Sequence, residues 1–85
     1  MQVTLDVPAY SPETGLRLHW VEGCELTVTL QAGAVCIRGN PAGLTSLAGH
    51  VLNLAQVGMP VGNHLHLDEH NALEEGSLEV ILERS

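Results

Sequence analysis

Three of the five histidines in this 85-residue chain lie within seven residues, in the stretch HLHLDEH from His64 to His70. If this stretch is a strand, His64, His66 and Asp68 occupy every second position and point to the same side. Two imidazoles on one face, with Asp68 or His70 as a third ligand, are donors that zinc accepts. The spacing therefore permits a metal site formed by His64, His66, Asp68 and His70.

A second interpretation of this stretch needs no metal. Leu65 and Leu67 alternate with His64 and His66, which is typical of a strand with one buried and one exposed face. The histidines would then be the polar half of that strand, hydrogen-bonded to Glu79 or to a partner. The sequence has no cysteine cluster, H-E-x-x-H motif or second histidine pair to complete a zinc site. We therefore favour a recognition surface and expect no cofactor.

Charge is distributed unevenly along the chain. Ten Asp and Glu residues against three Arg give a net charge of −7. This charge repels nucleic acid and anionic membranes, so we expect neither as a partner, and it attracts basic partners. Residues 68–85 hold six carboxylates against Arg84 alone, a net charge of −5, whereas residues 39–67 contain no Asp, Glu, Lys or Arg.

Length and composition predict one small domain that spans residues 1–85. A chain of this length buries about 60% of its unfolded surface and is too short for two independent cores. Apolar residues make up 45% of it, yet no apolar run approaches the roughly 18 residues of a membrane span. Met1 is not followed by the basic and apolar segments of a secretory signal, so we expect a cytoplasmic protein.

A helix is predicted from about Pro41 to Gln56. Asn40 can cap it, and Pro41 occupies the first helical position, where the missing N–H costs nothing. Apolar residues at spacings of three and four predict a buried stripe of Leu44, Leu47, Ala48, Val51, Leu54 and Ala55. The opposite face is small, polar and uncharged. We expect a contact surface there, and one alternative is a homodimer through Ser46, Gly49, His50 and Asn53.

Elsewhere, apolar residues alternate with polar ones, which predicts strands. The segments with this pattern are 3–7, 16–20, 26–30, 35–37, 64–67 and 78–82. A two-residue loop at Ala32-Gly33 pairs Leu30 with Val35 and Val28 with Ile37, which keeps the large apolar side chains on one face.

These elements predict an α+β fold of two layers. The expected order is β-β-β-β-α-β-β, an antiparallel sheet with one long helix packed on one face. A three-residue loop after Trp20 would pair this residue with Cys24 and complete a meander. In that register Cys24 and Cys36 lie about 17 Å apart, so we expect free thiols. The second face of the sheet is left open, with His64 and His66 on it.

No motif indicates an enzyme. The serines lack the surroundings of an activated nucleophile. Glu74 and Glu75 adjoin Gly76, as in a solvated turn, and are not spaced like an acid/base pair. No glycine-rich phosphate loop is present. We therefore expect a non-catalytic protein.

From about Val35 onward, the chain resembles a known family. A strand ending in Ile-x-Gly leads to Asn-x-x-Gly-Leu-x-x-Leu-Ala, then to His-x-His-Leu-Asp and a closing Leu-x-x-Gly-Ser segment. The residues that carry these motifs are Ile37, Gly39, Asn40, Gly43, Leu44, Leu47, Ala48, His64, His66, Leu67, Asp68, Leu73, Gly76 and Ser77. In this order, the motifs resemble the immunity protein 32 family of bacterial polymorphic toxin systems.

The resemblance covers roughly the last fifty residues and implies a function. Such a protein binds and neutralises a cognate toxin encoded nearby, and an acidic chain suits a basic toxin. We expect the binding surface on the open sheet face and the acidic segment that follows it. Its candidate residues are His64, His66, Asp68, Glu69, His70, Glu74, Glu75 and Glu79.

Overall fold

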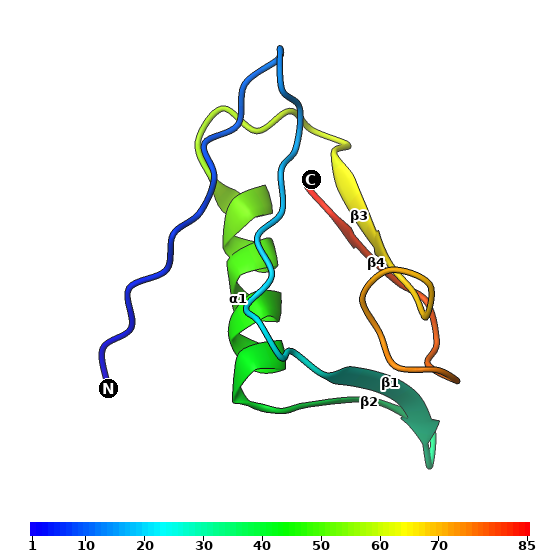
Figure 1. Cartoon of the computed structure of the whole chain (residues 1–85). Coiled ribbons are helices and arrows are strands. Elements are labelled where there is room, and N and C mark those ends of the chain that lie inside the picture. Colours follow the sequence, from blue (N-terminus) through cyan, green and yellow to red (C-terminus); the bar gives the residue numbers. More distant parts are fainter.

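The computed structural model describes residues 1–85 and contains one helix and four strands (Figure 1). In chain order these elements are β1 (Leu26–Gln31), β2 (Ala34–Gly39), α1 (Pro41–Ala55), β3 (His64–Leu67) and β4 (Val80–Glu83). β1 pairs with β2 and β3 with β4, both antiparallel. The α+β class is confirmed. No helix in the structure has the length and apolarity needed to cross a membrane.

The β1–β2 hairpin has the predicted register. Leu30 pairs with Val35 and Val28 with Ile37. Ala32 and the glycine after it form the loop with φ angles of 50° and 82°. A two-residue turn of type I′ requires left-handed φ at both positions, and its twist matches that of the strands. The large apolar side chains of the hairpin therefore share one face.

α1 begins at the predicted residue. The Oδ1 of Asn40 accepts hydrogen bonds from the N–H of Gly43 at 2.7 Å and from the N–H of Glu25 at 3.0 Å. The Nδ2 of Asn40 donates to the carbonyl of Gly23 at 2.9 Å. One side chain thus caps the helix and holds the chain that enters β1. Gly43 lies so close to the carbonyl of Glu25 that a Cβ at this position would overlap the oxygen.

A loop segment joins the two hairpins at the edge of β1. The N–H of Glu74 donates to the carbonyl of Leu26, and the N–H of Leu78 donates to that of Val28, both at 2.8 Å. The N–H of Val28 donates in turn to the Oγ of Ser77 at 3.1 Å. Side chains from both hairpins meet behind this edge. The core they form consists of Leu26, Val28, Leu67 and Leu73.

The prediction of one sheet in the order β-β-β-β-α-β-β is wrong. The structure has four strands in two separate sheets, in the order β-β-α-β-β. Residues 3–7 and 16–20 form no strands, and the predicted pairing of Trp20 with Cys24 does not occur. Cys24 and Cys36 are free thiols.

Residues 5–21, here called the N-terminal strap, lie along α1 instead of joining a sheet (Figure 1). The N–H of Val21 donates to the Oγ of Ser46 at 2.8 Å, and the Nδ2 of Asn53 donates to the carbonyl of Arg17. Helix side chains thus satisfy strap backbone groups that a strand neighbour would otherwise satisfy. This pairing explains why the alternating pattern of the strap does not produce a strand.

The strap reverses the predicted orientation of α1. The polar residues Ser46, His50 and Asn53 are only 1%, 1% and 2% exposed, whereas Leu44 and Val51 are 48% and 49% exposed. Of the predicted buried stripe, Leu54 is buried, Leu47 is half-buried, and the remaining four residues are exposed. The face predicted to form a homodimer, Ser46, Gly49, His50 and Asn53, is not free for that contact, because the strap covers it.

Candidate partner-binding surface

β3 presents its histidines outward, as the alternation predicted. Leu65 and Leu67 are 6% and 2% exposed, while His64 and His66 are exposed. The two imidazole rings stand edge to face with centroids 5.0 Å apart. The buried leucines fix the strand, and the strand fixes the spacing of the two rings.

Residues of β4 and the preceding Glu79 lie beside this histidine pair. His66 lies opposite Ile81, and His64 lies opposite Glu83. The Nδ1 of His66 is 3.3 Å from the Oε1 of Glu79, and both side chains are about half exposed. The predicted contact with Glu79 is therefore present for His66, whereas His64 contacts the carbonyl of Gly62 instead. Besides the histidines, this face carries the exposed carboxylates of Glu79 and Glu83 and the exposed side chain of Ile81.

An ordered loop follows the histidines and carries most of the acidic candidates. The carbonyl of Asp68 accepts hydrogen bonds from three successive N–H groups, those of Asn71, Ala72 and Leu73. Its Oδ1 accepts from the N–H of His70 at 2.8 Å. These bonds close a helix-like turn over the buried side chain of Leu73, which is 5% exposed.

Glu69 closes the other end of the same loop. Its Oε2 accepts a hydrogen bond from the N–H of Gly76 at 2.8 Å. Glu74 and Glu75, which lie between these ends, are both exposed. We call residues 68–76 the acidic loop. Backbone hydrogen bonds hold the carboxylates of Asp68 and Glu69 in place, and the main chain of Glu74 is fixed by its bond to Leu26. The loop backbone therefore needs little ordering to meet a partner, while the side chains of Glu74 and Glu75 are free in solvent.

A polar groove of about 310 Å³ lies beside the acidic loop. It is lined by Glu25, Thr27, Arg38, Gly39, Asn40 and Glu74. The set predicted from the sequence contains Glu74 but not Glu25 or Arg38. The sequence does predict that Glu25 lies on the same side of the chain as Thr27, because the two residues are two positions apart in an extended segment.

The acidic charge of this surface is not neutralised within the chain. Two histidines lie near carboxylates, His66 at 3.3 Å from Glu79 and His70 at 3.8 Å from Glu69, and each contact is an ion pair only when the imidazole is protonated. No arginine is paired with a carboxylate. Arg84 donates instead to the main-chain carbonyls of Leu54 and Gln56. Uncompensated carboxylates on one surface produce a field that attracts a basic partner.

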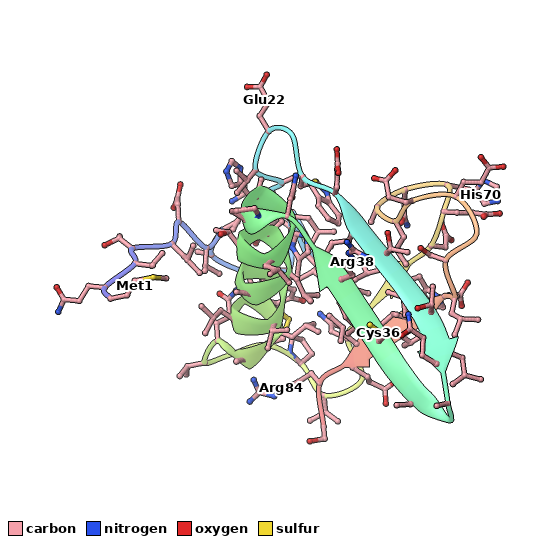
Figure 2. The ribbon with its side chains drawn as sticks, turned by 90° about the horizontal axis from the view of Figure 1, so that it is seen from below. Met1, Glu22, Cys36, Arg38, His70 and Arg84 are labelled. Carbon is pink, nitrogen blue, oxygen red and sulfur yellow. The ribbon has the colours of Figure 1, made fainter.

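The structure does not assemble the predicted metal ligands. No three His, Cys, Asp or Glu side chains are arranged to hold a metal ion. The Nδ1 of His64 donates to the carbonyl of Gly62 at 3.0 Å, while Asp68 is occupied by the N–H of His70. Figure 2 shows His70 at the outer end of its loop, and its side chain is 86% exposed. The four predicted ligands therefore do not converge on one point.

A second group of polar residues lies beneath the strap. His50 is 1% exposed, and its Nε2 has no hydrogen-bond partner. It lines a cavity of about 30 Å³, space for about one water molecule. Burial lowers the pKa of His50, and the nearby His19 lowers it further. The neutral form of His50 is therefore favoured beneath the strap.

The fold and this surface define a small α+β protein with an ordered, uncompensated acidic face. The chain belongs to the Immunity protein 32 family, whose model matches residues 34–85. This range includes β2, α1, β3, β4 and the acidic loop. It confirms the resemblance that begins near Val35. A search of curated proteins gave no match, and neither did a search of solved structures.

Proposed function

We propose that this protein is a non-catalytic immunity protein that binds and neutralises a cognate toxin. The observation that carries the proposal is the convergence of the acidic loop with the outer face of β3 and β4. The acidic loop follows β3 directly in the chain, and the Nδ2 of Asn71 in this loop donates to the carbonyl of His66 in β3 at 2.8 Å. Membership of the Immunity protein 32 family supports a toxin as the partner.

The contact surface that we propose comprises the outer histidines, the acidic loop and one carboxylate that precedes β4. Its residues are His64, His66, Asp68, Glu69, His70, Glu74, Glu75 and Glu79. The polar groove beside Glu74 adds Glu25 and Arg38 to this surface. A carboxylate at each side of a groove can receive an arginine or lysine of the partner. Arg38 offers the one nearby site for a partner carboxylate.

The charge of this surface favours a basic toxin. Long-range attraction between a basic enzyme and an acidic inhibitor mainly raises the association rate, by about 10- to 1000-fold at low ionic strength. Ile81, which lies opposite His66 and is 54% exposed, can bury apolar area once the two proteins meet. Charge thus guides the encounter, and buried contacts set the lifetime of the complex.

In this proposal the protein neutralises the toxin by binding to it and does not catalyse a reaction. None of the surface residues forms a nucleophile and base pair of the kind that acyl or phosphoryl transfer needs. The proposal is tested by co-expression with candidate toxins chosen from the genes that flank its own. Restored growth of the host and recovery of both proteins in one complex support it. Absence of both would contradict it.

A further inference from the structure

The solvent-facing side of α1 is apolar along its whole length. Leu44, Val51 and Leu52 are 48%, 49% and 49% exposed, and the smaller Ala48 and Ala55 are exposed as well. The buried side of the same helix carries Ser46, His50 and Asn53 beneath the strap. A solvated helix normally shows the opposite arrangement, with charged residues outward. An apolar strip of this kind marks a contact surface.

The apolar strip borders a hollow. A groove of about 440 Å³ is lined on the helix side by Val51, Leu54 and Ala55. On the other side it is lined by the last two residues of β4 and the two residues that follow it, from Leu82 to Ser85. The only charged residues along it are Glu83 and Arg84, which have opposite signs. β2 also exposes apolar side chains, since Val35 and Ile37 are 63% and 45% exposed.

The spacing of the strip fits another helix. Leu44, Ala48, Val51 and Ala55 follow one another at intervals of four, three and four residues, the pattern of a seam between two helices. The two alanines alternate with the two larger residues. Small side chains let helix axes approach closely, while the larger ones fill the spaces beside them.

The absence of charged residues on α1 favours a second copy of this chain as the partner. Residues 39–67 contain no Asp, Glu, Lys or Arg, although the whole chain has a net charge of −7. A basic toxin would find no carboxylate on this helix, whereas a second copy would meet no like charge at the contact. The six carboxylates of residues 68–85 belong to other elements. We propose that two copies of this chain form a symmetric dimer by packing their α1 helices along Leu44, Ala48, Val51 and Ala55.

The dimer contains none of the acidic loop residues, so each copy keeps its proposed toxin surface. An isologous contact of this kind closes on itself and gives two copies related by a twofold axis. The proposal is independent of the function proposed above, because it concerns a different face and has a different readout.

Sedimentation equilibrium of the purified chain tests the dimer from about 1 μM to 1 mM. The wild type is expected to show the mass of two chains at the upper end. Val51→Glu places a charge in the seam of both copies and is expected to weaken association at least about 100-fold. Ile81→Glu, an equal change at an exposed site on β4, is the matched control and is expected to dimerise as the wild type does.

A second measurement does not depend on the folding of Val51→Glu. In a Cys24→Ser/Cys36→Ser background, Ala48→Cys is expected to cross-link to a second copy through a short bismaleimide, while Glu22→Cys at a remote turn is not. A wild type that stays monomeric throughout would overturn the proposal. So would a dimer that both glutamate variants leave unchanged, or equal cross-linking of the two cysteine variants.

Discussion

Trp20 stands edge-on to the imidazole of His50, with ring centroids 4.1 Å apart and ring planes at 69°. This contact joins the N-terminal strap to the buried face of α1. Trp20 is the only tryptophan of the chain, so its fluorescence reports directly whether the strap is docked. The strap in turn explains why the polar side of α1 faces inward.

The fold is expected to weaken at acidic pH because His50 is buried in its neutral form. Burial and His19 lower its pKa in the folded chain, whereas in the unfolded chain it is near 6.5. The unfolded state therefore binds more protons, and the free energy of unfolding falls as the pH drops below about 6.5 toward the folded pKa. Urea unfolding followed by Trp20 fluorescence should give a lower midpoint at about pH 5.5 than at about pH 7.5.

The control for this pH effect is His50→Leu, which replaces the imidazole beside Trp20 with an apolar side chain that cannot titrate. Its unfolding midpoint should differ less between the two pH values than that of the wild type. If both proteins lose the same stability on acidification, His50 is not the responsible group.

Two glycines of α1 should respond in opposite directions to alanine. Gly43→Ala places a Cβ against the carbonyl of Glu25, and such overpacking costs about 1–3 kcal/mol of unfolding free energy. Gly49→Ala meets no atom within 4 Å and should gain up to about 1 kcal/mol from helix propensity. Urea denaturation of the two variants measures the difference. A Gly43→Ala protein as stable as Gly49→Ala would contradict the close approach.

Asn40 should contribute more to the free energy of unfolding than an ordinary helix cap does. Asn40→Ala removes the bond to Gly43, which alone is worth about 1 kcal/mol, together with the bonds to Glu25 and Gly23. Asn40→Asp keeps the accepting oxygen and loses only the donation to Gly23, so its loss of unfolding free energy should be smaller. Equal losses in the two variants would show that the accepted bonds carry little of the effect.

The parts of the fold predicted correctly depend on neighbours in sequence. Asn40-Pro41 specifies a helix start through one side chain and one ring, and Ala32-Gly33 sets the hairpin register through local turn geometry. The strap was missed because residues 3–7 and 16–20 alternate like strands. The strap backbone bonds instead to side chains of α1 and of its C-cap residue Gln56, all more than twenty residues away. Alternation indicates an extended chain and does not identify what the chain pairs with.

The candidate surface followed the same division. The outward position of His64 and His66 and the contact with Glu79 were predictable, because both follow from period-two alternation. The groove between Glu25 and Glu74 was not, because it depends on the hydrogen bond from Glu74 to Leu26 across nearly fifty residues. Long-range pairing of this kind leaves no local pattern in the sequence.

Zinc should bind weakly to the histidine pair. His64 and His66 present two rings 5.0 Å apart, and no third ligand joins them. Calorimetric titration with Zn²⁺ should give an affinity weaker than about 1 μM. A submicromolar site that disappears in His64→Ala/His66→Ala would instead show that the histidine pair is a zinc site.

The most direct test of the account is the affinity of the purified chain for a candidate toxin chosen from the genes that flank its own. Glu74→Gln/Glu75→Gln removes two charges from the acidic loop, and Asp6→Asn/Glu22→Gln removes two elsewhere, so the net charge changes equally. We predict tight binding by the wild type, with an association rate that falls roughly 10-fold in the loop variant at low salt and much less in the control. Absence of binding, or equal losses in the two variants, would contradict the proposed surface.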